Sequence, residues 1–449
     1  VVMGNDPVKR LETAADIDSL LGRLFWLNRS LSGEGNRETL RIIQEYLPIE
    51  VCEYPCGKKV FDWTVPEEWF IRDAWIRDST GRDLVRFSDN PLHVVSYSEP
   101  INAGMSFAKL RHHLHTLPEV PDAIPYRTSY YKKDWGFCVT QDQYRLLSET
   151  SGDLDVCIDS RFDQNGHMVT GELYIPGDTA EEYLVSTYIC HPAMANDNLS
   201  GVLAAMVLAR DILDRGCNRV GWRFVFAPET IGAIAYLSEH ESDLAAVRGG
   251  FVLSCCGGKG PLGYKSSFQE GSVTNRAVKV AFRDKGIKPL EYPFSPTGSD
   301  ERQYSSPGFR IPMTTVCKDK YHEYREYHTS LDNLDFVNGE QILESVEVYR
   351  NAFSIIEHNQ IYCSLLQKGE PQLGRRGLYP RTGGGNKQPA NTKKGESKNY
   401  TSIDALSWAL FLADGENDLL TISEKSRIGF FDLLEVFRSL EEKEMVEKS

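Results

Sequence analysis

Residues Tyr188–Gly201 read YICHPAMANDNLSG and continue an apolar run, EYLVSTYIC, at 182–190. A continuous apolar run of this length is typical of a strand that is buried on both faces of a sheet. The stretch then places His191 and Asp197 just beyond the end of that strand. Imidazole nitrogens and carboxylate oxygens are the ligands that hydrolytic zinc sites use. The stretch therefore predicts a buried strand with metal ligands at the rim of its sheet.

Strands and helices alternate around this stretch. Apolar patterns predict strands at 182–190, 220–227 and 251–254, and helices at 199–213 and 231–240. This alternation is typical of an α/β sheet, which binds its ligands at the carboxyl ends of the strands. We therefore predict an α/β fold whose site lies at that edge.

Three further polar clusters follow apolar segments downstream. They are Glu229, the pair Asp300–Glu301, and Tyr327–Ser330, which contains His328. Because each cluster follows an apolar segment, we expect them to meet His191 and Asp197 at the same edge of the sheet.

Composition limits the class of protein. A chain of 449 residues is too long for one ordinary core, which predicts two or three domains. The net charge of −14 argues against a general nucleic-acid binder. No apolar run reaches the roughly 18–20 residues of a membrane helix, and the first residues lack a signal-peptide pattern. The ten cysteines are scattered, which is typical of core thiols in an intracellular enzyme. We predict a cytoplasmic protein that does not associate with membranes.

Residues 57–135 differ in character from their surroundings. Aromatic residues, prolines and short alternating runs dominate this segment, which indicates a small β-rich domain. Strand–helix alternation resumes after it. We therefore predict that it is inserted into a main domain formed by 1–56 and 136–370.

The C-terminal part is predicted to be a separate module. Residues 383–398 are rich in Gly, Asn and Lys, which indicates a flexible linker. Residues 399–449 have the order helix, turn, short helix and helix, which is typical of a winged-helix unit. From residue 401 onward, five Lys/Arg stand against eleven Asp/Glu, and such a module is poorly suited to phosphate contacts. We predict that it contacts a protein partner or a second copy of the chain, and not nucleic acid.

The loop at 28–39 lies between two predicted helices and contains two glycines and two arginines. Such a loop can hold an anion or a carboxylate. It can equally be a helix–helix corner with surface salt bridges, and the sequence leaves both interpretations open.

Three motifs occur in a characteristic order along the chain. They are Ala195–Gly201 (ANDNLSG), Gly298–Glu301 (GSDE) and Tyr327–Asp335 (YHTSLDNLD). They resemble the bridging-aspartate, serine–aspartate and last-histidine motifs of the co-catalytic zinc aminopeptidases, which are relatives of leucyl aminopeptidase, glutamate carboxypeptidase and glutaminyl cyclase. The resemblance implies a three-layer α/β fold of the aminopeptidase type.

A closer resemblance covers nearly the whole chain. The segments 29–35 (RSLSGEG), 60–66 (VFDWTVP), 114–118 (LHTLP) and 190–192 (CHP) resemble a bacterial family of aminopeptidase-like proteins. Members of that family have an inserted β domain and a C-terminal winged helix. The family is often associated with polysaccharide or secondary-metabolite gene neighbourhoods.

The chain departs from the two-zinc pattern at two positions. Glu229 is followed by Thr230, where the resembled enzymes carry a pair of glutamates, one a base and one a ligand. The next strand ends at Ser254, where they carry an aspartate ligand. Two ions about 3.5–4 Å apart need several carboxylates to offset their repulsion. We therefore expect one zinc per chain, although the sequence does not decide between one metal and two.

The resemblance implies a role for each residue. His191, Asp197 and His328 would be the zinc ligands, and Glu229 the catalytic base. If the register shifts by one residue, Glu229 becomes a ligand and Glu301 is the candidate base.

Several residues are candidates for substrate binding. Asp300 and Glu301 would hold a substrate ammonium group, or the Gly-Ser-Asp turn merely shapes the loop. Four weaker candidates would bind a substrate carboxylate or an oxyanion. They are Arg302, Tyr304, Tyr264 and Lys265.

The sequence thus predicts a zinc-dependent hydrolase of peptide or amide bonds that acts on a small peptide or amino-acyl substrate. One alternative is a catalytically silent scaffold, because ligands are missing. Another is single-zinc acyl transfer or cyclisation of the glutaminyl cyclase type.

Overall fold

The structure of the protein is a computed structural model that describes residues 9–378 and 403–449. The chain divides into two compact units. The first comprises Val1–Asn275 and Pro289–Arg350, and the second Arg276–Lys288 and Asn351–Ser449.

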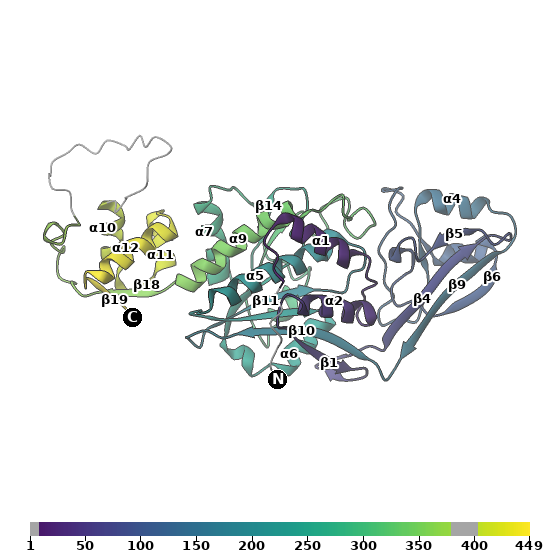
Figure 1. Cartoon of the computed structure of the whole chain (residues 1–449), viewed down its shortest axis with the longest axis horizontal. Coiled ribbons are helices and arrows are strands. Elements are labelled where there is room, and N and C mark those ends of the chain that lie inside the picture. Colours follow the sequence, from purple (N-terminus) through teal and green to yellow (C-terminus); the bar gives the residue numbers. More distant parts are fainter. Residues whose placement is uncertain (1–8, 379–402) are drawn as a thin grey trace. The chain divides into compact units, whose positions relative to one another are not determined.

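An eight-stranded mixed sheet forms the centre of the first unit (Figure 1). Its strand order is β1-β10-β12-β11-β13-β16-β14-β15. The four neighbours β12, β11, β13 and β16 are parallel, and antiparallel pairs flank them. The strands are β1 (Glu50–Pro55), β10 (His167–Ile175), β11 (Glu182–Tyr188), β12 (Gly221–Ala227), β13 (Val247–Val252), β14 (Leu262–Lys265), β15 (Leu290–Tyr292) and β16 (Met313–Lys318).

The predicted strand at 182–190 is confirmed as β11, in which every residue is buried. Val185 pairs with Phe224 of β12 on one side and with Phe251 of β13 on the other. A strand with a parallel neighbour on each side and helices on both faces has no polar face, which explains its continuous apolar sequence.

Helices cover both faces of this sheet, as predicted for a three-layer α/β fold. α5 packs on β11 and β12, whereas α6 contacts β10 from the opposite face (Figure 1). α5 can begin against the sheet because its first residue is Gly201, where a Cβ would lie 2.3 Å from Leu253 O. The larger helices and the short α8 are α1 (Ala14–Phe25), α2 (Glu34–Gln44), α5 (Gly201–Arg215), α6 (Ile231–Glu239), α7 (Val273–Asp284), α8 (Glu301–Tyr304) and α9 (Gly339–His358).

A second, four-stranded antiparallel sheet belongs to the β-rich part of the first unit. Its order is β5-β4-β9-β6, and β9 pairs with both β4 and β6. Because β9 begins at Leu154, this part extends beyond residue 135, where the sequence placed its end. The strands are β4 (Glu68–Arg77), β5 (Asp83–Arg86), β6 (Ile101–Met105) and β9 (Leu154–Asp163).

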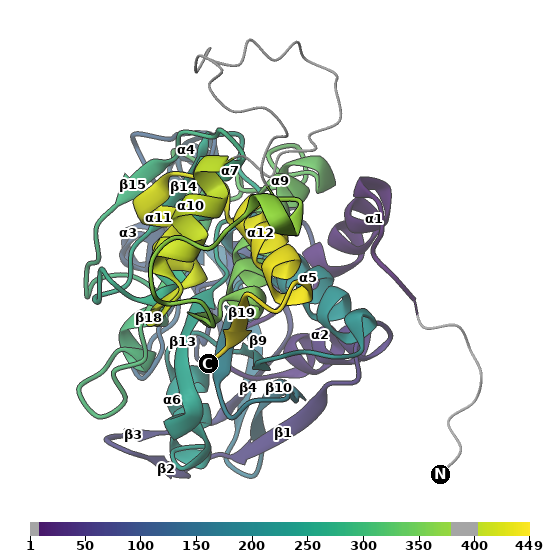
Figure 2. The same cartoon turned by 90° about the vertical axis from the view of Figure 1, so that its left-hand side faces the viewer.

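Smaller elements complete this β-rich part. The two-stranded hairpin of β2 (Lys59–Val60) and β3 (Trp63–Thr64) lies beside α6 (Figure 2). The others are α3 (Phe107–Leu110), β7 (Leu114–His115), β8 (Phe137–Cys138) and α4 (Gln141–Glu149).

The second unit contains the predicted winged helix. It has a three-stranded sheet of order β18-β17-β19, which α11 and α12 contact, and α10 packs on those two helices. The predicted linker at 383–398 lies outside the described residues. The elements are β17 (Ile361–Ser364), α10 (Ile403–Leu412), β18 (Asp414–Asp418), α11 (Leu419–Ser426), α12 (Phe430–Glu442) and β19 (Val446–Lys448).

Within the described residues, no helix combines the length and the apolar character that crossing a membrane requires.

Candidate metal centre

The carboxyl ends of three parallel strands meet at one edge of the central sheet. His191 follows β11, Glu229 follows β12 and Ser254 follows β13. This is the edge at which α/β sheets bind ligands.

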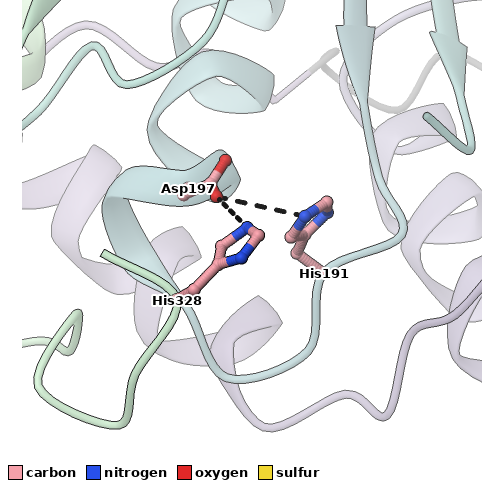
Figure 3. A group of neighbouring side chains, drawn as sticks. All are labelled: His191, Asp197 and His328. Carbon is pink, nitrogen blue, oxygen red and sulfur yellow. Dashed lines mark ion pairs between the residues drawn. The ribbon is translucent and has the colours of Figure 1, made fainter. Parts of the chain in front are cut away.

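His191, Asp197 and His328 come together at this edge (Figure 3). Their ligand atoms all lie within 4.8 Å of one another. Asp197 Oδ2 is 3.1 Å from His328 Nε2 and 4.0 Å from His191 Nε2. The side chain of His328 is 30% exposed, whereas the other two are buried, so the cluster opens to solvent on the His328 side. The structure thus brings together the three residues that were predicted as metal ligands.

The donor set fits a zinc ion. Zinc binds imidazole nitrogens and carboxylate oxygens at about 2.0–2.2 Å, which places two ligand atoms of one ion about 3–4 Å apart. The distances of Asp197 Oδ2 to the two histidines, 3.1 and 4.0 Å, correspond to this spacing. Two imidazoles and one carboxylate with one side open are the donor set of a catalytic zinc site.

The second oxygen of Asp197 is occupied within the protein. The hydroxyl of Tyr188 donates a hydrogen bond to Asp197 Oδ1 and lies 2.7 Å from Ser254 Oγ. Burial opposes the ionisation of Asp197, but His191 and His328 outweigh it and lower the pKa of Asp197 to about 2. Burial keeps the pKa of Tyr188 well above its usual range, so its hydroxyl remains a donor.

His191 is oriented by the residue that precedes it. Its Nδ1 lies 3.2 Å from Cys190 Sγ, which leaves Nε2 facing Asp197. Burial lowers the pKa of His191 to about 4. The imidazole is therefore neutral at neutral pH, which is the form that binds a metal.

Arg29, in the loop at 28–39, supports the main chain of His191. Its side chain is completely buried, and it donates from Nε and Nη2 to His191 O at 3.1 and 2.8 Å. A third bond, of 2.5 Å, runs from Nη1 to Leu24 O. Burial lowers the pKa of Arg29 to about 10, so it is still a cation at neutral pH. Arg29 therefore binds carbonyl oxygens, a role that neither interpretation of this loop had included.

Asp332 joins the two loops that carry the metal-ligand candidates. It is completely buried and accepts main-chain N–H bonds from Ala195, Asn196 and Asp197 at 3.2, 2.6 and 2.9 Å. Burial raises the pKa of Asp332 to about 7. Since Asp332 lies four positions after His328, one carboxyl group fixes the Asp197 loop relative to the His328 loop.

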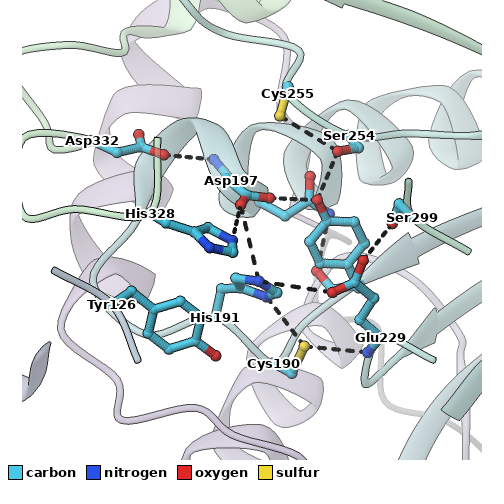
Figure 4. Close-up of polar contacts among 12 residues, drawn as sticks. Tyr126, Cys190, His191, Asp197, Glu229, Ser254, Cys255, Ser299, His328 and Asp332 are labelled. Atoms are coloured by element: carbon cyan, nitrogen blue, oxygen red, sulfur yellow. Dashed lines mark hydrogen bonds and ion pairs between the residues drawn. The ribbon is translucent and has the colours of Figure 1, made fainter. Parts of the chain in front are cut away.

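Glu229 faces the metal-ligand candidates from the end of β12 (Figure 4). Its Oε2 is 3.9 Å from His191 Nε2, and its Oε1 accepts a hydrogen bond of 2.8 Å from Ser299 Oγ. Burial, together with the charge of Asp197, raises the pKa of Glu229 to about 7. A carboxyl group with this position and pKa can accept and release a proton near neutral pH.

The residue after Glu229 is held in a strained conformation. Thr230 has a φ of 64°, which is an outlier for a β-branched residue. Its N–H donates to Asp300 Oδ1 at 2.7 Å, and its hydroxyl accepts from Arg302 Nη2 at 3.3 Å. Thr230 thus bonds to an arginine at the position where the resembled two-zinc enzymes carry a glutamate ligand.

Asp300 and Glu301, the candidates for binding a substrate ammonium, are both buried. Asp300 holds the main chain of Thr230. Glu301 Oε1 pairs with Lys265 Nζ and accepts a bond of 2.7 Å from the Tyr321 hydroxyl. These two carboxyl groups therefore stabilise the residues around the site and do not lie at its opening.

The four weaker substrate-binding candidates differ in their exposure to solvent. Lys265 and Tyr264 are buried on β14, and Tyr304 is buried with its hydroxyl 2.8 Å from Ser186 Oγ. Arg302 is exposed. Of these four, therefore, Arg302 is the one whose side chain is presented to solvent.

The β-rich part contributes a wall of the site that sequence patterns did not reveal. Tyr126 N–H donates to His328 O at 2.8 Å, and Ser330 N–H donates to Ile124 O at 2.9 Å. The Tyr126 ring lies 5.1 Å from the His191 ring and 5.2 Å from the His328 ring (Figure 4). Residues 124–126 contain no residue type that binds metals, so nothing in the sequence indicated that they lie at the site.

Tyr327 packs against one of the metal-ligand candidates. Its ring stacks on His328 at a centroid distance of 3.9 Å. Among the described residues its hydroxyl has no hydrogen-bond partner. Burial, and then the charge of Asp197, raise the pKa of Tyr327 well above its usual range, so the hydroxyl is protonated. The sequence motif contained Tyr327 without suggesting a role for it.

Comparisons with known proteins agree with this architecture. The sequence model of the family described as "Domain of unknown function (DUF4910)" matches residues 18–359, and a winged helix-turn-helix model matches residues 360–448. A protein of Clostridium acetobutylicum named "Putative polysaccharide biosynthesis protein with aminopeptidase-like domain" is 41% identical over 419 residues, which are 93% of each chain.

Two solved structures extend the comparison. A crystal structure described as a "putative peptidase" from Clostridium acetobutylicum superposes with a TM-score of 0.88 at 37% identity, covering 97% of this chain and 96% of that one. BSAP, a zinc aminopeptidase from Bacillus subtilis, superposes with a TM-score of 0.53 at 13% identity, covering 77% of this chain and 95% of that one. The second likeness establishes a shared aminopeptidase-type fold.

Proposed function

This chain belongs to the DUF4910 family, and from that premise we propose that it is a zinc-dependent hydrolase of peptide or amide bonds with a small amino-acylated substrate. The observation that carries the proposal is the cluster of His191, Asp197 and His328 with Glu229 Oε2 3.9 Å from His191 Nε2. Three ligands and an adjacent carboxyl group are the parts that metal-assisted hydrolysis of an amide requires.

His191, Asp197 and His328 would hold the zinc. When bound, a zinc ion polarises a carbonyl group and lowers the pKa of a bound water toward about 7. The neutral imidazole of His191 and the ionised carboxylate of Asp197 are already in the protonation states that binding needs.

Glu229 would act as the base. Ser299 engages Oε1, which leaves Oε2 directed toward the ligand cluster. We propose that Oε2 takes a proton from the attacking water and passes it to the leaving nitrogen. The alternative, in which Glu229 is a ligand and Glu301 the base, has less support because Glu301 is buried and paired with Lys265.

Tyr327 would stabilise charge on the substrate. Its protonated hydroxyl is available for a new hydrogen bond and stands next to His328. A donor in this place can bind the carbonyl oxygen as negative charge develops on it.

One zinc per chain is the proposed content. In place of a second set of ligands the chain has Thr230 and Ser254, and the Tyr188 hydroxyl occupies Asp197 Oδ1. A second cation beside the first would lack the carboxylates that offset the repulsion between them.

Metal analysis and one pair of variants test the proposal. Purified protein should contain about one zinc per chain, and His191→Ala should lose it, because a three-ligand site needs each ligand. Glu229→Gln should retain the zinc but hydrolyse aminoacyl amides at least about a hundredfold more slowly, since general base catalysis supplies roughly 10²–10⁴-fold.

The results separate the competing functions. Full zinc retention in His191→Ala would remove the assigned site, and normal turnover by Glu229→Gln would remove the assigned base. A protein without zinc would favour the silent scaffold. A zinc protein that converts glutaminyl peptides to cyclic products without hydrolysis would favour the cyclisation alternative.

We also propose that the C-terminal winged helix serves protein contact or self-association. Its charged side chains are predominantly acidic, and Phe411 on α10 is 78% exposed. Sedimentation velocity of the full chain and of Phe411→Ser tests this: an assembly that the substitution weakens supports self-association through α10, and equal behaviour as monomers argues against it.

A further inference from the structure

Arg302 is an exposed cation beside the proposed base. Its Nη2 donates to the hydroxyl of Thr230 at 3.3 Å, and Thr230 directly follows Glu229. No carboxylate of the described residues lies within the 4.0 Å ion-pair distance of this guanidinium. A guanidinium has five N–H donors in a fixed fork, so one bond to Thr230 leaves a free edge.

The local backbone determines the position of the Thr230 hydroxyl that Arg302 contacts. Thr230 keeps its φ of 64° while Asp300 Oδ1 accepts its N–H at 2.7 Å. Strained residues of this kind persist where the surrounding structure over-determines them, and they cluster at ligand-binding sites. The bond to this hydroxyl therefore places the Arg302 guanidinium beside the residue that follows Glu229.

We propose that Arg302 binds the free α-carboxylate of the amino acid that leaves when the substrate is cleaved. The preferred substrates are then acyl- or aminoacyl-amino acids with a free carboxylate, such as dipeptides. This inference rests on the proposed hydrolase function and names its substrate class.

The chemistry of the leaving group places its carboxylate near Arg302. In hydrolysis the carbonyl carbon forms a bond to the water oxygen, the C–N bond breaks, and Glu229 transfers a water proton to the leaving nitrogen. The products are a carboxylic acid and an amino acid. The α-carboxylate is attached to that nitrogen through a single carbon atom, so it lies next to Glu229 when the nitrogen does. A guanidinium fork binds a carboxylate through two parallel hydrogen bonds.

The buried carboxyl groups support the same choice. Asp300 Oδ1 accepts the Thr230 N–H and Glu301 Oε1 is paired with Lys265. Both carboxyl groups are buried, so neither is presented to solvent as Arg302 is. An ammonium in this place would also meet the positive charge of Arg302.

A selectivity ratio tests the inference. The kcat/KM of Leu-Gly divided by that of Leu-Gly amide should exceed one in the wild type. In Arg302→Gln the ratio should fall by about 10- to 100-fold, which is the range for a hydrogen bond to a charged group. Arg310→Gln is the matched control, because it removes another exposed arginine shortly after α8 and should keep the wild-type ratio. A wild-type ratio near one, or an equal ratio in Arg302→Gln, overturns the inference.

A binding measurement separates this inference from the proposed function. Zinc-loaded Glu229→Gln is titrated with Leu-Gly and with Leu-Gly amide by calorimetry, with and without Arg302→Gln. Tighter binding of Leu-Gly that is lost with Arg302→Gln supports the carboxylate site, even if the wild type hydrolyses neither peptide. Turnover of both peptides with no difference in binding supports the hydrolase and overturns the carboxylate site. If neither peptide binds, the proposed carboxylate site is also overturned.

Discussion

Asp332 holds the metal-ligand loops together without being a ligand candidate itself. In Asp332→Asn the amide NH2 would face main-chain N–H groups that now donate to a carboxylate. Loss of an outer partner of this kind typically costs about 10- to 100-fold in metal affinity, and we expect that loss here. Competition with a chromophoric chelator measures it. The control is Asp335→Asn, which changes an exposed carboxylate nearby. Equal zinc affinity in the two variants would contradict the role of Asp332.

His240 gives the protein a pH-dependent contribution to stability. Its Nε2 lies 2.8 Å from Glu172 Oε2, and this bond raises the pKa of His240 above its usual 6.5. The folded state thus favours the protonated form. Its stabilisation is complete below pH 6.5 and is lost as the pH rises through the folded-state pKa.

We therefore expect His240→Gln to be less stable than the wild type by about 0.5–1 kcal/mol in acid, in line with a partly exposed ion pair. The difference should shrink above the raised pKa. Urea unfolding of both proteins at about pH 5.5 and about pH 9 measures it. A difference that grows toward pH 9 would contradict the assignment.

Residues of the site differed in how far the sequence could predict them. His191, Asp197, Glu229 and His328 were found because they carry reactive groups within recognisable motifs. Arg29 could not be found, since it acts through the carbonyl oxygen of His191, and any strand end offers that group. A side chain that binds a main-chain carbonyl does not require a particular residue type at its partner position. Such contacts depend on the fold and cannot be predicted from the sequence.

Secondary structure near the site was predictable because local and global signals agree there. The apolar sequence of β11 reflects its burial on both faces. The end of the β-rich part was not predictable in the same way. β9 begins at Leu154 and pairs with β4, which begins at Glu68, and a pairing between segments so distant in sequence has no local pattern.

We propose that the residues at the ends of β11, β12 and β13 also limit the number of ions that the site binds. Tyr188→Phe combined with Thr230→Glu and Ser254→Asp would free Asp197 Oδ1 and supply two carboxylates. We expect the zinc content to rise from about one to about two per chain, because the repulsion between two ions is then offset. Elemental analysis after dialysis measures it.

The single change Tyr188→Phe is the control for this result. It removes the hydroxyl but adds no carboxylate, so its zinc content should stay near about one per chain. A folded triple variant that still binds one zinc would show that something other than these three side chains limits the count.

At the scale of the whole molecule, the charge of the second unit bears on what the protein can bind. Acidic residues lie on α12, which is the helix that would contact DNA in a DNA-binding winged helix. The exposed side chains of α12 include Asp432, Glu435 and Glu442, and Arg438 there is paired with Glu435. The first residue of α12, Phe430, donates its N–H to Asp284 Oδ2 at 2.8 Å. In helix-turn-helix proteins the N-terminal residues of the recognition helix contact the bases. Here a carboxylate of α7 occupies that end.

We therefore expect the full chain to bind duplex DNA more weakly than about 10⁻⁴ M at physiological salt, the weak limit for non-specific binders. Fluorescence anisotropy with a labelled duplex of random sequence measures this, and a known winged-helix DNA binder at the same salt is the positive control. Asp432→Lys with Glu435→Lys reverses the charge of the exposed α12 face and should strengthen binding if surface charge is the cause. Salt-dependent binding by the unmodified chain in the micromolar range would contradict the assignment, because that dependence is the signature of phosphate contacts.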